Sequence, residues 1–400
     1  MNLHKNRINI LYIGYWSALD GLSESTIKPH INILNSFDEV KSIFYSSIER
    51  EKIEVKCNWD IAKMIHIPFY SPPKSFLRDK IDDFTKIPSK LILLCNKNKI
   101  DKIICRSALA GAIGYLIWKK TKIPYYVESF EPHGAYMLES KVWTKYDLRY
   151  WIQQYFETKQ KKTASALMPV SNNYTAFLKQ DTSIKCAIET IPCSVDTEKF
   201  SFSLQERNTI RKKLNIAPNA IVGIYVGKFG DIYYNKEAFD FFKMCLNYLD
   251  NFFLLILTPQ HLDKIKTKLK NVEYPLNKCW VGNVNHNEVT NYLSASDVAF
   301  SLHKTTKWSM AFSPIKNGEY WANGLPILIN ENIGDDSTVI STQGGGIIIN
   351  YNHTLILEQI NNIKDLIIKS NTNRLNNQSV TNAKTYRNEC ITQAVYKKTL

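Results

Sequence analysis

The stretch from Phe312 to Ile329 brings a cation, a carboxylate and an amide to one side of a short predicted helix. Lys316, Glu319 and Asn323 follow one another at spacings of three and four residues, which places them on one helix face. A lysine beside an open helix N-terminus favours a phosphorylated ligand. Glu319 cannot bind a phosphate, because both are anionic, but its carboxylate suits a vicinal diol such as a nucleotide ribose.

The ends of this helix are also predicted from residue types. Ser313 and Pro314 suit the N-cap and the first helical position, and Gly324 suits the left-handed residue that ends a helix. Ser313 also offers a hydroxyl to a phosphate oxygen. The alternative is a capped surface helix on which Lys316 and Glu319 form only a weak ion pair.

A second candidate for phosphate binding is the sequence YVGKFG, in which Gly227, Lys228 and Gly230 lie at the end of a predicted strand run at 220–229. Glycines at a strand end permit close approach of a ligand to the backbone, and a lysine offers a point charge to a diphosphate. Lys236 is a weaker candidate, because it is equally explained as a solvated helix residue.

The sequence YYVESFEPHGAYM (125–137) ends a predicted strand with Glu128 and Glu131, and His133 follows. We expect these polar side chains to face a ligand cleft, where His133 donates to a sugar or phosphate oxygen and a carboxylate orients an acceptor hydroxyl. The alternative for His133 is a purely structural histidine.

Gly14 and Gly21 bracket the loop after the first predicted strand, and Ser23 or Ser25 is expected to cap the next helix. The dinucleotide fingerprint G-x-G-x-x-G is absent. Gly21 is a candidate for close approach of a ligand to the backbone, with an ordinary strand–helix turn as the alternative.

These candidates are positioned by an alternation of apolar strands and helices, which predicts an α/β fold with parallel sheets covered on both faces. The pattern occurs twice, so we expect two Rossmann-like doubly wound domains facing across a cleft, at residues 1–198 and 199–385, with a closing helix at 386–400 that packs back on the first. Strands are predicted at 8–14, 40–46, 62–69, 101–107, 123–130, 165–171, 220–229, 252–258, 279–284, 297–303, 325–330 and 345–350.

Composition is that of a globular protein, with 44% hydrophobic and 22% charged residues in a chain of 400. No apolar run is long enough to span a bilayer, and the N-terminus lacks a signal-peptide pattern, so we expect a cytoplasmic protein. The eight cysteines are scattered without metal-ligand or disulfide spacing, which favours buried free thiols.

Lysines and arginines outnumber acidic residues by 51 to 37, a net charge of +14. This surplus favours polyanionic partners: a nucleotide diphosphate, an acidic membrane or nucleic acid. The segment 141–162 interleaves aromatic and basic residues and could lie on an anionic membrane surface, although such a stripe is more often half core and half solvated charge. Nucleic-acid binding is disfavoured, because no recognition motif accompanies the charge.

Four stretches, in this order, resemble the GT-B glycosyltransferases, in particular the retaining family 4 group (glycosyl transferases group 1). IPCSVDTEKF (191–200) is similar to the family's interdomain segment, and YVGKFG to its V-G-R stretch, with Lys228 in the place of the arginine. VGNVNHNEVTNYLSASDVAFSL (281–302), which contains Gly282, resembles its G-x-V…A-D-V segment. GEYWANGLPIL matches its E-A-x-A-x-G-x-P segment.

The resemblance implies a metal-independent retaining transferase that needs no cofactor and moves a sugar from a nucleotide diphosphate-sugar to a glycan or lipid-linked acceptor. Bacterial surface polysaccharide, lipopolysaccharide or capsule synthesis is the implied setting, with the enzyme at the inner face of the cytoplasmic membrane. It places Glu319 on the donor ribose and His133 near the donor sugar and phosphates. The expected site residues are His133, Lys228 and Glu131 for catalysis, Gly227, Gly230, Gly282, Ser313, Lys316 and Glu319 for the donor, and Gly21 and Glu128 for the acceptor.

One position departs from the family pattern. The family has an earlier glutamate, separated by seven intervening residues from the one at Glu319, and that position is Ala311 here. Lys316 or backbone amides near Phe312 and Ser313 are the expected substitutes. A catalytically silent scaffold and a sugar-nucleotide epimerase therefore stay open as alternatives.

Overall fold

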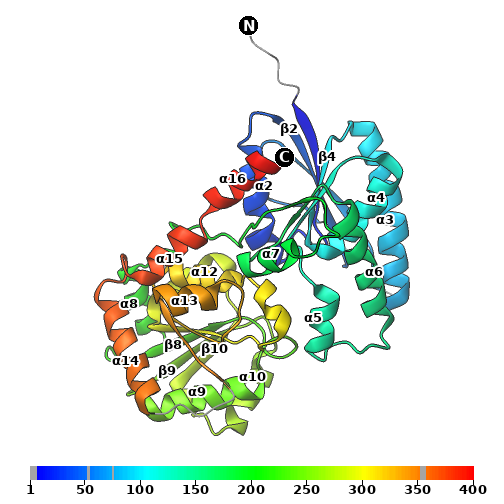
Figure 1. Ribbon diagram of the computed structural model, residues 1–400. Coiled ribbons are helices and arrows are strands. Elements are labelled where there is room, and N and C mark those ends of the chain that lie inside the picture. The colour runs from blue at the N-terminus through cyan, green and yellow to red at the C-terminus, as the bar shows by residue number, and fades with distance from the viewer. Residues whose placement is uncertain (1–6, 52–54, 74–75, 352–356) are drawn as a thin grey trace. The chain divides into compact units, whose positions relative to one another are not determined.

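The computed structural model describes residues 7–51, 55–73, 76–351 and 357–400, and the chain divides into two units (Figure 1). Unit 1 comprises Met1–Ser194 together with Glu389–Leu400, and unit 2 comprises Val195–Asn388. The sequence placed the corresponding boundaries at 198/199 and 385/386.

Unit 1 is built on a parallel sheet of seven strands in the order β3-β2-β1-β4-β5-β6-β7. Its order reverses between β1 and β4, where Ile10 is in register with Lys102 and Ile13 with Cys105. The predicted strand runs of this half all contain a strand, whereas β7 was missed because it has only two residues. The strands are β1 (Ile8–Ile13), β2 (Val40–Glu49), β3 (Met64–Tyr70), β4 (Lys102–Arg106), β5 (Tyr125–Glu128), β6 (Ala166–Met168) and β7 (Ala187–Ile188).

Helices cover both faces of this sheet. On one face, α2 packs on Ile10 and Tyr12 of β1, and the C-terminal helix α16 lies beside α2 (Figure 1). On the other face, α4 packs on β4 and β5 and is flanked by α3 and α6. The helices are α1 (Gly21–Thr26), α2 (Lys28–Asn35), α3 (Phe76–Asn98), α4 (Ser107–Thr121), α5 (His133–Glu139), α6 (Leu148–Thr163), α7 (Asn172–Lys179) and α16 (Glu389–Thr399).

Two glycines allow α4 to approach its neighbours closely. A Cβ at Gly114 would lie 2.4 Å from Cys105 Sγ in β4, and a Cβ at Gly111 would lie 2.2 Å from Gln160 Oε1 in α6. Larger residues at these positions would push α4 off the sheet.

Unit 2 is built on a parallel sheet of six strands in the order β10-β9-β8-β11-β12-β13. Numbered within the unit, this is the 3-2-1-4-5-6 order of the doubly wound fold, and its switch point lies between β8 and β11. The strands are β8 (Val222–Val226), β9 (Phe253–Leu257), β10 (Cys279–Gly282), β11 (Val298–Ser301), β12 (Ile327–Ile329) and β13 (Gly346–Ile348).

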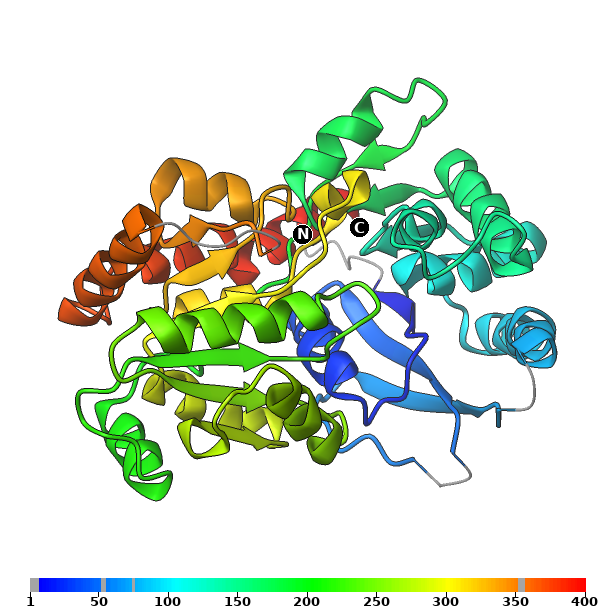
Figure 2. The same cartoon turned by 90° about the horizontal axis from the view of Figure 1, so that it is seen from below.

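Alternate residues of these strands enter two separate cores. Leu255 and Leu257 pack under α8, α11, α12, α13 and α15, while Leu254 and Ile256 pack under α9, α10 and α14. Figures 1 and 2 show these helix layers around the sheet. The helices are α8 (Leu204–Lys213), α9 (Lys236–Tyr248), α10 (Leu262–Asn271), α11 (Val289–Ala295), α12 (Ile315–Ala322), α13 (Asp336–Gln343), α14 (Leu357–Thr372) and α15 (Gln378–Tyr386), with 3-10 turns η1 (Leu276–Lys278), η2 (His286–Glu288) and η3 (Lys307–Ala311).

Two predicted helix caps are wrong. Asp20, not Ser23 or Ser25, caps α1, because its Oδ1 accepts the Leu22 N–H at 2.8 Å. Helix α12 starts one residue later than predicted, with Pro314 as its N-cap, since the Ser313 hydroxyl is engaged elsewhere. The predicted end is confirmed, because Gly324 has a positive φ of 73°.

All eight cysteines are free, and Cys95, Cys105 and Cys245 are the buried ones, so burial was predicted correctly only in part. Among the described residues, no helix combines the length and the apolar character needed to cross a membrane.

Candidate donor and acceptor sites

The candidate site of unit 2 lies at the carboxyl ends of β8 and β11, the switch point where doubly wound folds bind ligands. Gly227 follows β8 with a φ of 140°, a backbone geometry that favours glycine. A Cβ on Gly227 would lie 3.3 Å from Lys316 Nζ, so the glycine backbone and the lysine ammonium are close neighbours. Gly230 also requires glycine, because its φ is 92°.

Lys316 projects from the first turn of α12 into an aromatic surround. Its Nζ lies 4.7 Å from the centre of the Tyr225 ring and 4.5 Å from that of Tyr233. Burial lowers the pKa of Lys316 to about 7, although Glu319 opposes the shift. Within the described part of the chain, no carboxylate forms an ion pair with this ammonium. The site therefore holds a partly desolvated cation that no carboxylate of the described residues neutralises.

His303 borders the same site at the end of β11. Its ring centre lies 4.8 Å from that of Tyr233, and its Nδ1 lies 3.3 Å from Ser301 Oγ. Burial is the main cause that lowers the pKa of His303 well below its ordinary value, and the nearby positive charge of Lys316 adds to it, so the imidazole is neutral. The histidine adds no second positive charge.

Glu319 lies one turn further along α12 and is buried. Its Oε1 is 3.0 Å from Nε2 of His286, in the turn after β10. No hydrogen bond to His286 Nδ1 is formed within the described residues, although this atom is buried. His286 was not predicted; its place in a polar loop directly after a strand was the available signal.

Ser313 belongs to a buried polar network behind the start of α12. Its hydroxyl accepts a hydrogen bond from Arg387, and Arg387 also forms an ion pair with Asp336. Asp336 accepts a further bond from Asn317 Nδ2 at 2.8 Å. Burial raises the pKa of Asp336, against the influence of Arg387. This network fixes the N-terminus of α12, and sequence reasoning missed it because its members are up to 74 residues apart.

The remaining predicted donor residues are spread around the same strand ends. Lys228 is exposed directly after Gly227, and its carbonyl accepts a hydrogen bond from the Tyr225 hydroxyl. Gly282 ends β10, where a Cβ would clash with Trp280. Lys236 is exposed on α9 and pairs with Asp240 at 3.1 Å, so it is the solvated helix residue that the alternative described.

Ala311 is buried at the end of η3, and the structure places no carboxylate at this position. The backbone here is held by Gly334, where a Cβ would lie 1.8 Å from the carbonyl oxygen of Phe312. Ser309 accepts the Gly334 N–H at 2.9 Å. The segment is well supported without the family's first glutamate.

In unit 1, His133 and Glu131 form the pair that their spacing allows. His133 Nδ1 lies 2.9 Å from Glu131 Oε1, and the ring packs edge-on against Trp143. The backbone of the following Gly134 donates to Glu157 at 3.0 Å. Burial raises the pKa of Glu157 to about 7, although the Gly134 N–H favours its charged form. Glu157 was not predicted.

The expectation that the Glu128 side chain faces a ligand is corrected. The residue is fully buried, and it accepts hydrogen bonds from Tyr12 Oη at 2.6 Å and from the Tyr396 hydroxyl of α16. Burial alone would raise its pKa, but His30 and Arg106 lower it to about 2. Glu128 thus fastens α16 to the sheet, because the fold provides it with internal donors.

Gly21 begins α1, and a Cβ there would meet nothing within 4 Å. Close packing is instead required at Gly14, where a Cβ would lie 2.8 Å from Ile27 Cδ1. The glycine at position 21 is therefore not needed for a close approach within the protein.

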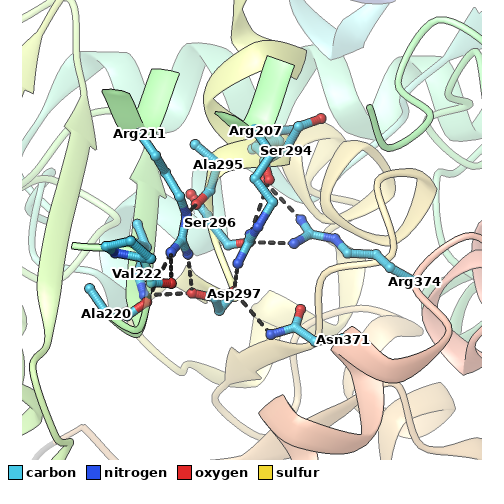
Figure 3. Close-up of polar contacts among 12 residues, drawn as sticks. Arg207, Arg211, Ala220, Val222, Ser294, Ala295, Ser296, Asp297, Asn371 and Arg374 are labelled. Carbon is cyan, nitrogen blue, oxygen red and sulfur yellow. Dashed lines mark hydrogen bonds and ion pairs between the residues drawn. The ribbon is translucent and has the colours of Figure 1, made fainter. Parts of the chain in front are cut away.

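At the opposite, amino-terminal edge of the unit 2 sheet, Asp297 is clamped by arginines (Figure 3). Arg207 and Arg211 of α8 pair with its two oxygens at 2.7 and 2.6 Å. Asp297 also accepts the Val222 N–H at 2.8 Å. Burial would raise its pKa, but the two arginines lower it below the ordinary value. The aspartate of the A-D-V segment is thus structural.

Known proteins share this architecture. Residues 206–379 match the family model described as Glycosyl transferases group 1. No curated protein sequence matches the chain. Sucrose-phosphate synthase from Thermosynechococcus elongatus superposes with a TM-score of 0.75 at 15% identity, over 98% of this chain and 99% of that one.

Two further solved structures are similar at 12% identity. HepE from Anabaena, in complex with UDP-glucose, has a TM-score of 0.71 over 98% of this chain and 99% of its own. WaaG, a glycosyltransferase involved in lipopolysaccharide biosynthesis, has a TM-score of 0.65 over 96% and 99%. The predicted fold is confirmed: the chain has the GT-B fold. Within its second unit, residues 206–379 resemble the glycosyl transferases group 1 family.

Proposed function

We propose that the protein is a retaining glycosyltransferase that moves a sugar from a nucleotide diphosphate-sugar to a hydroxyl of a glycan or lipid-linked acceptor. The observation that carries this proposal is Lys316, a partly desolvated ammonium beside the Gly227 backbone at the switch point of unit 2. An anionic ligand would supply the charge that the described protein groups do not. HepE, which is similar in fold, was solved with UDP-glucose, which makes a uridine donor the first to test.

In the proposed reaction, the bond between the anomeric carbon and the diphosphate oxygen breaks, and a bond forms from that carbon to the acceptor oxygen. The acceptor's proton leaves with the diphosphate. Negative charge therefore develops on the leaving group, where Lys316, Lys228 and the start of α12 would stabilise it. The reaction requires no metal in this proposal.

The other predicted residues would bind or orient the donor. Glu319, oriented by His286, would accept hydrogen bonds from the ribose hydroxyls. Gly230 and Gly282 would let the donor approach the strand ends, and Ser313 would orient the α12 N-terminus through Arg387. His133, paired with Glu131, would donate to the transferred sugar.

A screen of sugar nucleotides tests the donor. UDP-glucose or GDP-mannose should raise the melting temperature and be slowly hydrolysed, and Lys228→Ala should lower kcat whereas Lys236→Ala should not. Both lysines are exposed, so neither variant is expected to disturb folding. Free epimerised sugar nucleotide would instead identify an epimerase, binding without turnover would identify a silent scaffold, and stabilisation by oligonucleotides alone would refute donor binding.

The acceptor proposal includes contact with an anionic membrane, as expected for surface-polysaccharide assembly on a lipid carrier. Leu148, Trp151 and Tyr155 recur on one face of α6 and are 52, 60 and 51% exposed. Lys159 continues this face, with its Nζ 5.2 Å from the Tyr155 ring. Exposed aromatics with lysines beside them are typical of helices that lie in a membrane interface.

Vesicle co-sedimentation tests this contact. The protein should bind phosphatidylglycerol vesicles more tightly than phosphatidylcholine vesicles at low salt, and the double variant Trp151→Ala/Tyr155→Ala should weaken binding severalfold. Tyr248→Ala is the matched control, because Tyr248 is similarly exposed on α9 of unit 2. Equal loss in the control variant, or no binding to anionic vesicles, would exclude the α6 surface.

A further inference from the structure

Unit 1 contains a cavity of about 470 Å³ at its own switch point, which none of the predicted acceptor residues lines. Trp16 and Asp20 enter it from the loop after β1, Glu49 and Glu51 from the end of β2, and Leu109 from α4. Its volume is within the range of about 300–1,000 Å³ typical of small-molecule sites. Carboxyl strand ends next to a switch point are where folds of this type bind ligands.

The basic residue in this cavity is already neutralised. Arg50 Nη2 lies 2.7 Å from Asp83 Oδ2, and Asp83 is fully buried. Asp83 also accepts the Tyr15 hydroxyl hydrogen bond at 2.6 Å. Arg50 and Asp83 together add no net charge to the cavity.

Glu49 is a buried carboxylate in the lining of the cavity, with 3% of its surface exposed. Its Oε1 accepts hydrogen bonds from Ser47 Oγ at 2.6 Å and from the Ala18 N–H at 3.1 Å. Its Oε2 has no hydrogen-bond donor among the residues that the structure describes. This oxygen is therefore left for a hydroxyl or an amine of a ligand.

The charge of the cavity is opposite to that of the chain. Among the described lining residues, Asp20, Glu49 and Glu51 contribute three carboxylates, while the chain as a whole carries +14. A ligand carboxylate or phosphate placed here would meet like charges, which disfavours its binding. Neutral hydroxyls and ammonium groups would instead find acceptors.

The apolar part of the lining complements these carboxylates. The Trp16 ring and the Leu109 side chain border the same space. A sugar ring has apolar C–H faces and a polar hydroxyl edge, so it matches a lining of one aromatic plane and few carboxylates.

We propose that this cavity binds the acceptor sugar, and that the sugar bound there is neutral or carries an amine, not a carboxylate or phosphate. The proposal rests on the proposed function, since it names the acceptor class of that reaction. Glu49 and Trp16 select the acceptor through a hydroxyl-accepting oxygen and an aromatic face, and Glu51 sets the sign of the charge at the rim.

Binding of simple glycosides to the full-length protein tests this proposal. In saturation-transfer NMR, methyl glucoside and methyl glucosaminide should bind in the millimolar range, and methyl glucuronide at least tenfold more weakly. Trp16→Ala should weaken the first two, and Glu49→Gln should reduce the preference for the amine.

Charge reversal provides the matched comparison. Glu51→Lys should shift the preference between glucosaminide and glucuronide toward the glucuronide by at least threefold. Asp38→Lys should not, because Asp38 is equally exposed but lies before β2, at the other edge of the sheet. Preference for the glucuronide in the wild type, no glycoside binding, or the same shift in both lysine variants would overturn the proposal.

A UDP titration of the same samples separates this inference from the proposed function. UDP binding without the predicted glycoside pattern refutes the acceptor cavity alone. The glycoside pattern without any nucleotide or sugar-nucleotide binding refutes the transferase function and leaves a sugar site.

Discussion

A buried and a half-buried charge in unit 2, at opposite edges of one sheet, differ in how their surroundings compensate them. Asp297, at the amino end of β11, is compensated by Arg207, Arg211 and the Val222 N–H. Lys316, near the carboxyl end of β11, faces the rings of Tyr225 and Tyr233 and has no ion-pair partner among the described residues. A compensated charge fixes the fold, whereas an uncompensated one is costly unless a ligand supplies its counter-ion.

Removal of the compensated charge should have the largest effect. Asp297→Ala leaves two arginines without their carboxylate, so the free energy of unfolding should fall by about 3–5 kcal/mol. Since the folded-state pKa of Asp297 is lowered, its contribution to stability is present above the ordinary carboxyl pKa and is lost as the pH falls through the folded value. Urea unfolding at pH 7 and pH 3 checks both points. A variant as stable as the wild type would show that Asp297 is not part of the structural core.

Removal of the uncompensated charge should lower activity without lowering stability. Lys316→Met should lower kcat/KM for the donor by about 10²–10³, the usual cost of one transition-state charge contact. At pH 6 the free energy of unfolding of the variant should equal or exceed that of the wild type. The reason is that methionine, unlike a charged lysine, carries no cost of desolvation among apolar groups. Urea unfolding and steady-state kinetics measure the two quantities. A destabilised Lys316→Met with unchanged kinetics would mean that Lys316 is structural, as Asp297 is.

Glu319 carries a charge that His286 compensates only in part. Glu319→Ala should raise the donor KM by about 10–100-fold with a smaller change in kcat, because the ribose hydroxyls are bound equally in ground and transition states. His286→Ala removes only the orienting partner, so its effect on KM should be smaller. A lower kcat at unchanged KM in Glu319→Ala would contradict ribose binding.

The smallest expected effect is a change of donor affinity with pH. The pKa of Lys316 in the free protein is about 7, and a bound diphosphate would favour the charged form. Donor binding should therefore take up a proton, and the Kd for UDP-glucose should rise by up to about tenfold per pH unit above pH 7.5. Calorimetry in buffers of different ionisation enthalpy measures the proton uptake. Lys316→Met should show none, and a pH-independent Kd in the wild type would refute the coupling.

Fold class and most strand positions could be predicted because apolar runs of four to eight residues repeat with helices between them. The cap at Ser23 could not be predicted, because Asp20 competes for the same helix end. The cap at Ser313 could not be predicted either, because Arg387, 74 residues away, engages its hydroxyl. Short strands such as β7 have too few residues for any pattern to be visible.

The sequence by itself determined the doubly wound architecture, the resemblance of residues 206–379 to the glycosyl transferases group 1 family, and the placement of Lys316 and Glu319 on one face of a helix. These features depend on local periodicity and spacing. Only the tertiary structure decided which charges are compensated. Glu128 meets Tyr396 across 268 residues, and Glu319 meets His286 across 33, while Glu49 keeps one oxygen without a described donor. Compensation depends on contacts between distant segments, and local patterns do not specify such contacts.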